Sequence, residues 1–221
     1  MPKTTKGPDS AEELIKNLIL GAEQACKQYL QMSGHPAPGV APELFLHAGA
    51  ARALRKFGST WIVLEEPVLQ TLNAAGAKAP GPHKKTTRSN GRYDIVLYWK
   101  NQAPRAAIEV KSPVSVDSKQ RYEKDIDRLI DTMTRNPEST FQFASFLFLT
   151  VKRKKNQDYD FKQASDEIEH FVSEVLAKKV NEKVQNSKNS KLKLRIASSR
   201  TYKILGEKPG AWRISALSIT R

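Results

Sequence analysis

The fold is decided by RYDIVLYW at residues 92–99 and RAAIEVK at residues 105–111. Apolar residues alternate along the first stretch, and Ile108 and Val110 share one face of the second, which is the period of two found in β-strands. Between them, residues 101–104 contain asparagine and proline and are typical of a turn. The two stretches are therefore predicted to form a β-hairpin.

The hairpin is expected to bring three chemically active side chains together. Glu109 and Lys111 are two residues apart, so a strand places them on one face. With the turn near residues 101–102, Asp94 lies opposite or diagonal to Glu109, at roughly 5–8 Å. Two carboxylates this close repel each other unless a cation neutralises them, and Mg²⁺ prefers such oxygen ligands. We predict a metal site in which Lys111 positions or deprotonates an attacking water, or stabilises charge on phosphorus.

The segments around the hairpin predict one α/β domain over residues 1–221. In chain order we expect a helix at 10–33 opened by a capping box, a helix at 42–57, a strand at 60–65, an ambiguous stretch at 68–75, the hairpin, a helix at 117–133, an apolar strand at 141–151, a helix at 159–184, and strands at 192–202 and 212–219. The apolar strand is expected at the centre of a mixed β-sheet flanked by helices.

The spacing of the three residues resembles a known pattern. Asp94, fourteen intervening residues and then Glu109-Val110-Lys111 on the second arm of a hairpin resembles the PD-(D/E)XK, or restriction-endonuclease-like, nucleases. Tyr93 stands where the family pattern has proline. The likeness divides the chain into an N-terminal helix and loop at 1–41, a nuclease core at 42–180 and basic C-terminal strands at 181–221.

The resemblance implies a Mg²⁺-dependent phosphodiesterase that hydrolyses DNA as an endonuclease or exonuclease, with Mn²⁺ able to substitute. Asp94, Glu109 and Lys111 would be its catalytic residues. The metal would be held by Asp94 and Glu109, the Val110 carbonyl, and Glu43. Glu43 opens the second predicted helix, the place where such nucleases commonly carry a further glutamate.

Charge supports a polyanionic partner. The chain has 37 Lys and Arg against 23 Asp and Glu, a net charge of +14, and contacts to phosphates release condensed counterions. Candidate contacts to nucleic acid are Lys84, Lys85, Arg88, Arg92 and Lys124. The plainer interpretation of Lys84, Lys85, Arg88 and Arg92 is that they lie on a solvated loop before the hairpin. Lys124, Asp125 and Arg128 are expected to form a solvated helix face. The alternative is that Lys124 or Arg128 contacts a phosphate.

Composition excludes some classes of site. The single cysteine, Cys26, rules out an internal disulfide framework and a cysteine-based zinc site, and its helical position favours a buried thiol. No apolar run reaches the ~18 residues of a membrane-spanning helix. Residues 1–9 lack the apolar core of a signal peptide, so a cytoplasmic protein is expected.

Tryptophans and histidines add little to the functional prediction. Trp61, Trp99 and Trp212 are expected to pack in the core or against the sheet rather than to stack on bases. His47 and His170 lie on predicted helices without a partner pattern, so neither receives a role.

Several alternatives stay open. Glu109 and Lys111 could be an ordinary ion pair on an exposed sheet face, and Glu65 or Glu66 could replace Glu43, since acids are common in the first turn of any helix. The chain could also be a non-catalytic nucleic-acid-binding subunit of the same fold, or a basic structural or RNA-associated protein. The sequence does not distinguish DNA from RNA, or a homodimer from a subunit of a larger complex.

Overall fold

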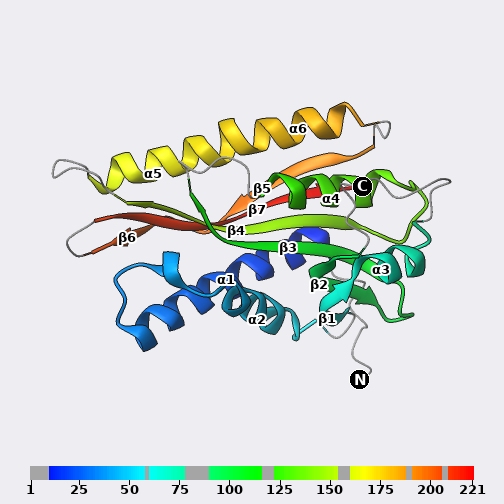
Figure 1. The fold of residues 1–221 in the computed structure, drawn as a ribbon, viewed down its shortest axis with the longest axis horizontal. Coiled ribbons are helices and arrows are strands. Elements are labelled where there is room, and N and C mark those ends of the chain that lie inside the picture. Colours follow the sequence, from blue (N-terminus) through cyan, green and yellow to red (C-terminus); the bar gives the residue numbers. More distant parts are fainter. Residues whose placement is uncertain are drawn as a thin grey trace, which may run out of the picture.

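The computed structural model describes residues 10–57, 60–77, 90–115, 122–153, 160–187, 191–205 and 209–221. Within these ranges the chain forms a seven-stranded mixed β-sheet with helices on both faces (Figure 1). The predicted fold class, a mixed sheet flanked by helices, is confirmed. None of the helices in the same ranges combines the length and the apolar character needed to cross a bilayer.

The strands lie in the order β1 (Thr60–Pro67), β2 (Arg92–Trp99), β3 (Pro104–Ser115), β4 (Phe143–Arg153), β7 (Gly210–Thr220) and β5 (Lys193–Ser198), while β6 (Tyr202–Ile204) also pairs with β7. Neighbours are antiparallel except β3 and β4, which are parallel and are connected through a helix. β4 lies inside the sheet and is buried from Phe143 to Thr150, so the prediction of a central strand is confirmed.

The predicted hairpin is present as β2 and β3. Ile95 lies opposite Ile108 in their antiparallel register. Extending that register by one residue sets Asp94 across from Glu109. The register is specific because a slip of one residue would turn every buried side chain to the other face of the sheet.

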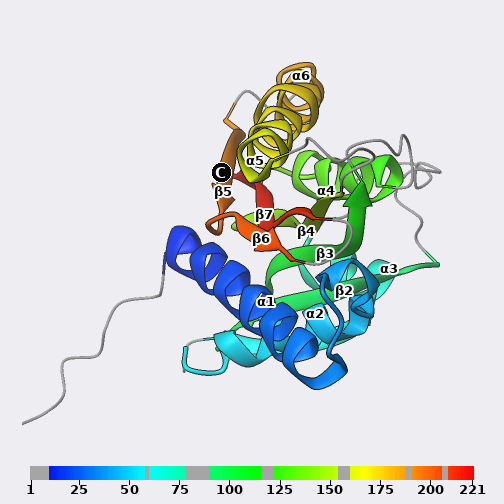
Figure 2. The same cartoon turned by 90° about the vertical axis from the view of Figure 1, so that its left-hand side faces the viewer.

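Helices cover the two faces of the sheet unequally (Figures 1 and 2). One face carries α1 (Ala11–Ser33), a short 3-10 turn (Pro38–Val40) and α2 (Glu43–Leu54). The other face carries α4 (Glu123–Thr134), α5 (Phe161–His170), a π-helical segment (Phe171–Ala177) and α6 (Lys178–Gln185). The last three elements follow one another without a break, which matches the single long helix predicted there.

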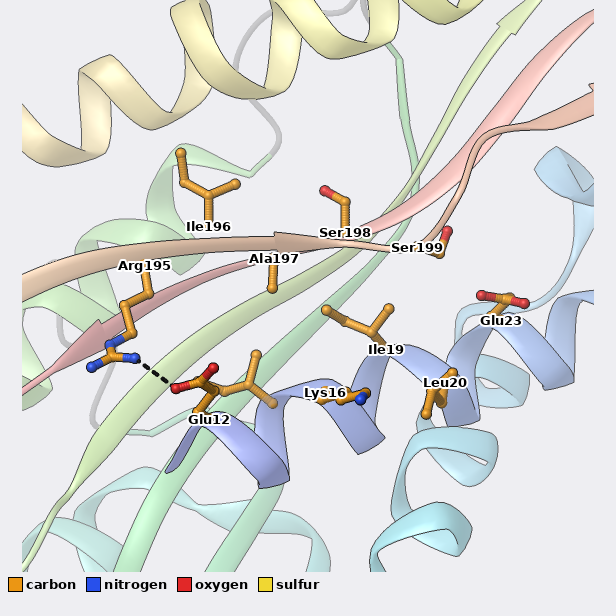
Figure 3. A pocket seen from close by; sticks show the side chains of 11 residues that line it. Glu12, Lys16, Ile19, Leu20, Glu23, Arg195, Ile196, Ala197, Ser198 and Ser199 are labelled. Carbon is orange, nitrogen blue, oxygen red and sulfur yellow. Dashed lines mark hydrogen bonds and ion pairs between the residues drawn. The ribbon is translucent and has the colours of Figure 1, made fainter. Parts of the chain in front are cut away.

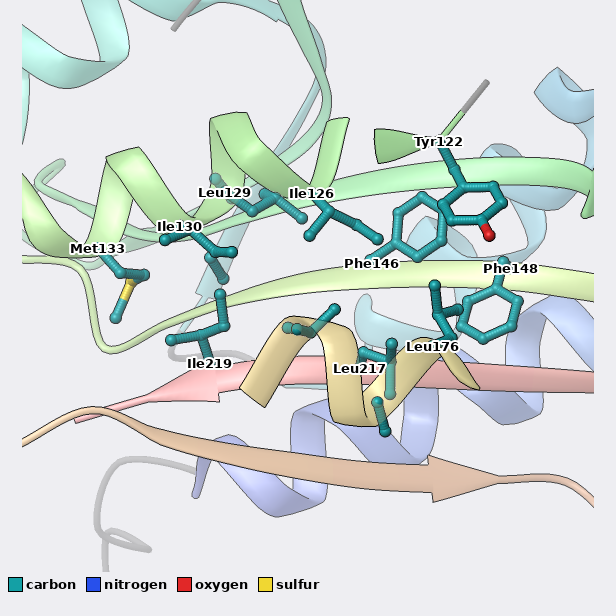
Figure 4. Close-up of a cluster of buried hydrophobic side chains, with 14 of the residues drawn as sticks. Tyr122, Ile126, Leu129, Ile130, Met133, Phe146, Phe148, Leu176, Leu217 and Ile219 are labelled. Carbon is teal, nitrogen blue, oxygen red and sulfur yellow. The ribbon is translucent and has the colours of Figure 1, made fainter. Parts of the chain in front are cut away.

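Two segments refine the sequence-based assignment. The stretch that the sequence left ambiguous forms α3 (Val68–Ala74), directly after β1. The helix predicted from residue 117 is described from Glu123 onward, and residues 116–121 lie outside the described ranges. The side chains predicted to face inward from this helix are buried against β4, β7 and the π-helical segment (Figure 4): Tyr122, Ile126, Leu129, Ile130 and Met133.

Close packing of α1 against α2 fixes the position of α2 over the sheet. A Cβ atom at Gly21 would lie 2.4 Å from the Gly49 carbonyl oxygen, so a larger residue would push the two helices apart. At the start of α1 the Ser10 hydroxyl accepts a hydrogen bond from the Glu13 amide, which is the Ser10 half of the predicted capping box. Cys26 is buried as predicted, and burial raises the pKa of its thiol to about 12.

The tryptophan predictions are right at two positions and wrong at one. Trp212 is buried, and Trp99 packs against the Arg105 guanidinium, whose carbon lies 4.0 Å from the ring centroid. Trp61 is 55% exposed. The physical reason is its place on β1, the strand that ends the sheet on this side.

Candidate metal centre

Side chains from two elements meet at the first turn of α2. Glu43 opens the helix, and His47 follows four residues later on the same face. Asp94 reaches them from β2. Each of the three offers one ligand atom, and these atoms all lie within 4.8 Å of one another. Carboxylate oxygen and imidazole nitrogen are ordinary ligands of divalent cations, so this group is suited to hold one.

Asp94 is held in place by the strand opposite. The Val110 amide donates a hydrogen bond of 2.6 Å to Asp94 Oδ2, which fixes the position of the Asp94 carboxylate against β3. Burial raises the pKa of Asp94, the Val110 hydrogen bond and His47 lower it, and the charges of Glu43 and Glu65 raise it again. A cation bound beside Asp94 would therefore lower the pKa of this carboxyl and favour its ionised form.

His47 is the residue that the sequence-based reasoning missed. It is 4% exposed, and neither ring nitrogen has a hydrogen-bond partner among the described residues. Its Nε2 lies 3.7 Å from Asp94 Oδ2, and its Nδ1 lies 3.7 Å from Glu65 Oε1. Buried polar atoms are nearly always satisfied by protein, water or an ion, so these two nitrogens require an explanation. The signal was the spacing of four between Glu43 and His47 at a helix start.

Lys111 lies beside the same group. Its Nζ is 3.2 Å from Glu43 Oε2, and the Ser112 amide donates a hydrogen bond of 3.2 Å to that oxygen. Both side chains of the pair are about one-third exposed, at 31% and 32%. The structure thus brings together Glu43, Asp94 and Lys111 of the predicted site, with the lysine partly exposed.

Glu109 has a different environment. It is 3% exposed, and its Oε2 lies 2.6 Å from Arg128 Nη2 of α4. Its Oε1 accepts no hydrogen bond from any residue that the structure describes. Burial raises the pKa of Glu109 well above its usual range, Arg128 lowers it, and the charge of Asp94 raises it further. Glu109 therefore interacts with Asp94 through its charge but lies outside the group formed by Glu43, His47 and Asp94.

The solvated helix face predicted for α4 is wrong at two positions. Arg128 is buried, and its Nη2 also lies 3.1 Å from Asp125 Oδ1, so a single cation serves two acids. Arg128 is buried and paired with Glu109, so in this conformation it cannot contact a phosphate at the protein surface. Lys124 is exposed, as a solvated position requires.

The remaining predicted contacts are only partly described. Lys84, Lys85 and Arg88 lie outside the described residues. Arg92 is exposed on β2 and donates a hydrogen bond of 2.9 Å to the Glu65 carbonyl. Metal binding by the Val110 carbonyl stays a prediction. Of the two alternative acids, Glu65 faces His47, whereas Glu66 accepts a hydrogen bond from the Tyr98 hydroxyl.

Comparison with known proteins gives no independent guide to this site. No family model, no curated protein and no solved structure matches the chain. What can be said of its chemistry therefore comes from the residues: two carboxylates and a buried imidazole within reach of one ion, a solvent-facing lysine beside them, and a third carboxylate held by a buried arginine.

Proposed function

We propose that the chain is a metal-dependent phosphodiesterase that hydrolyses nucleic acid, with DNA as its substrate, on a restriction-endonuclease-like core. The observation that carries this proposal is the convergence of Glu43, His47 and Asp94 next to Lys111. The strand arrangement supports the proposed core, because Asp94 on the first arm of the hairpin accepts a hydrogen bond from the Val110 amide on the second, Lys111 lies beside Glu43 of α2, and the next strand runs parallel to the second arm.

Glu43, His47 and Asp94 fit a divalent cation through their donor atoms and through the two unsatisfied nitrogens of His47. A bound cation of this kind polarises the phosphoryl group and makes a bound water more acidic. Asp94 is oriented for that task by the Val110 amide. Lys111, which pairs with Glu43, would neutralise charge on the phosphate or hold the attacking water.

The imidazole of His47 changes which divalent cation the site is expected to prefer. Carboxylates alone suit Mg²⁺, whereas an imidazole ligand suits later transition metals better, and Mn²⁺ accepts both kinds of ligand. We therefore expect Mn²⁺ to support a higher rate than Mg²⁺ and to bind more tightly. Replacing His47 by alanine should reduce the difference between the two metals.

Cleavage of labelled DNA in Mn²⁺ and in Mg²⁺ tests the proposal. Asp94→Asn, Glu109→Gln and Lys111→Met should each abolish cutting, while Glu138→Gln, which alters an exposed acid on the α4–β4 connection, should cut like the parent protein. Circular dichroism melts confirm that each variant is folded. Retained cutting in all three site variants would reject the assignment.

A second candidate function is favoured by the Glu109–Arg128 pair. A carboxylate already held by a buried arginine needs no metal, as expected for a nucleic-acid-binding relative without catalysis. Calorimetry separates the two functions. The enzyme binds Mn²⁺ in a manner that depends on Asp94, whereas the non-catalytic module binds DNA equally well with and without the ion.

A further inference from the structure

A groove runs along the outer side of α2, between this helix and the edge strand β1. Its volume is about 760 Å³. On the helix side it is lined by Ala48, Ala51, Arg52 and Arg55, which are spaced as one face of a helix. Ala48 and Ala51 keep the bottom of the groove open, because a larger side chain at either position would fill that space.

The charge of this groove is positive. Arg52 and Arg55 are both exposed, and no acidic residue is among the described residues that line it. Neither arginine makes an ion pair with a carboxylate of the described chain. Arginine groups of this kind are suited to phosphate, which they can bind through two parallel hydrogen bonds.

The strand side of the groove offers a flat aromatic surface. Trp61 is 55% exposed, and Leu64 beside the groove is exposed as well. Single-stranded nucleic acids are bound by this combination, in which bases stack on aromatic rings and cations follow the backbone. A large exposed tryptophan in a groove whose described lining includes two arginines and no acid is thus better matched to bases and phosphates than to a basic peptide.

The two elements that line the groove also lead to the candidate metal centre. The helix begins with Glu43, and His47 directly precedes Ala48 of the groove lining. The strand that lines it leads from Trp61 to Glu65, whose Oε1 is 3.7 Å from His47 Nδ1. Four strand residues span about 13 Å, so a chain passing through the metal centre reaches the groove within a few nucleotides.

A second hollow, between α1 and β5, shows what is special about this groove (Figure 3). Its volume is about 540 Å³, and its lining carries acids as well as bases. There the Arg195 guanidinium is paired with Glu12 at 3.3 Å, as the dashed line in Figure 3 marks. Among the described residues that line this hollow, the one arginine is paired and none is aromatic, which makes the hollow a source of control variants.

We propose that the α2–β1 groove binds a single-stranded segment of the nucleic acid adjacent to the phosphate at the metal centre. Trp61 stacks on a base, and Arg52 and Arg55 bind backbone phosphates. The inference rests on the proposed function in taking nucleic acid as the substrate. It goes further by naming a single-stranded segment and the residues that bind it.

Binding without cleavage tests the groove directly. A fluorescein-labelled single-stranded DNA of mixed sequence is titrated with protein in EDTA, and anisotropy is measured at several salt concentrations. Trp61→Ala should weaken binding about 5- to 150-fold, the effect of losing one stacked base. The Arg52→Ala/Arg55→Ala variant should reduce the slope of log affinity against log salt by about 1.4, since each single-strand phosphate contact contributes ~0.7.

Matched variants keep the test decisive. Trp61→Phe retains a stacking ring and should recover most of the affinity. Lys16→Ala removes an exposed cation from the second hollow and should change neither affinity nor salt slope. Parent-like binding by both Trp61→Ala and the double arginine variant would overturn the proposal. So would conversion of a dimer to a monomer by Trp61→Ala in light scattering, because the groove would then be an interface between copies.

The assay also separates this proposal from the proposed function. Binding in EDTA does not depend on the metal centre, so failure of the site variants to lose cutting leaves the groove result unaffected. Conversely, parent-like DNA binding by the groove variants together with metal-dependent cutting would reject the groove and keep the enzyme.

Discussion

Two clusters of charged side chains flank β3, one on each face of the sheet, and they are neutralised differently. On the α4 side, the buried guanidinium of Arg128 lies between Glu109 and Asp125. On the α2 side, Lys111 is partly exposed and pairs with Glu43. Among the residues that the structure describes, the α4 cluster thus contains a buried cation of its own, whereas the α2 cluster has only this partly exposed lysine.

The α2 cluster therefore carries a surplus of negative charge. Asp94 has a backbone amide and a histidine as its neighbours, and His47 has two buried nitrogens without hydrogen bonds from the described residues. A divalent cation would neutralise the acids and satisfy the imidazole at once. The comparison favours the proposal that the α2 cluster binds the ion, while Arg128 of the α4 cluster holds Glu109.

The largest effect, on the free energy of unfolding, is expected from removing Arg128, the buried cation of the α4 cluster. Arg128→Met removes the guanidinium that pairs with the buried Glu109 carboxylate, and the free energy of unfolding should fall by about 3–5 kcal/mol. Urea unfolding followed by circular dichroism measures the loss. Adding Glu109→Gln to this variant should restore part of it. A loss below about 1 kcal/mol would show that the buried pair contributes little to stability.

The next effect concerns metal affinity. Asp94→Asn should weaken Mn²⁺ binding by about 100-fold or more, because even residues that only support metal ligands commonly contribute 10- to 100-fold. Glu109→Gln should have a smaller effect, since its carboxylate is held by Arg128. Titration calorimetry provides both values, with Glu138→Gln as the control. If Glu109→Gln weakened Mn²⁺ binding more than Asp94→Asn, the metal would have to bind on the α4 side of the sheet.

A smaller effect is expected from pH. Burial raises the pKa of both Asp94 and Glu109, so above their ordinary values the folded protein keeps protons that the unfolded chain has released. In the metal-free protein, the free energy of unfolding therefore falls as pH rises from the ordinary to the raised pKa values. Bound Mn²⁺ favours the ionised carboxylates, so its stabilising effect should grow over the same range.

Thermal melts with EDTA and with Mn²⁺, taken at intervals from about pH 4 to pH 8, test this dependence. The two melting curves should separate as pH rises, and Asp94→Asn should bring them closer together. An equal shift by Mn²⁺ at every pH would be inconsistent with binding to these acids.

The smallest effect is expected far from both clusters. Ser10→Ala removes the hydroxyl that caps α1, and the free energy of unfolding should fall by about 1 kcal/mol. Mn²⁺ affinity should not change, because the first turn of α2 packs near the C-terminal end of α1, where Tyr29 contacts Phe45, and the cap lies at the N-terminal end. A simultaneous loss of metal binding would mean that the α1–α2 packing at Gly21 and Gly49 transmits the change.

Local patterns were sufficient to predict the hairpin and the central strand. Alternation along residues 92–99 and 105–111 determines which side chains face the core, and that choice determines the register between β2 and β3. The positions of Asp94 on one arm and of Glu109 and Lys111 on the other follow from this short-range geometry, which is why the sequence could predict them. Glu43 reaches the hairpin through the packing of α2 on the sheet, and its predicted place at the site came from the family resemblance.

The rest of the site depends on tertiary contacts. Arg128 and Asp125 have the spacing of an ordinary solvated helix face, and only the packing of α4 on the sheet makes them buried partners of Glu109. His47 gains its neighbours from β1 and β2, which lie 18 and 47 residues further along the chain at Glu65 and Asp94. The exposure of Trp61 follows from β1 being an edge strand, which no local pattern in β1 reveals.

The central claim is that a divalent cation binds between α2 and the hairpin. A crystal soaked in Mn²⁺ and measured near the manganese absorption edge tests it most directly. The account predicts an anomalous peak within ligand distance of Glu43, His47 and Asp94. An anomalous map with Mn²⁺ bound only at other positions, and none beside Asp94 at saturating metal, would contradict it.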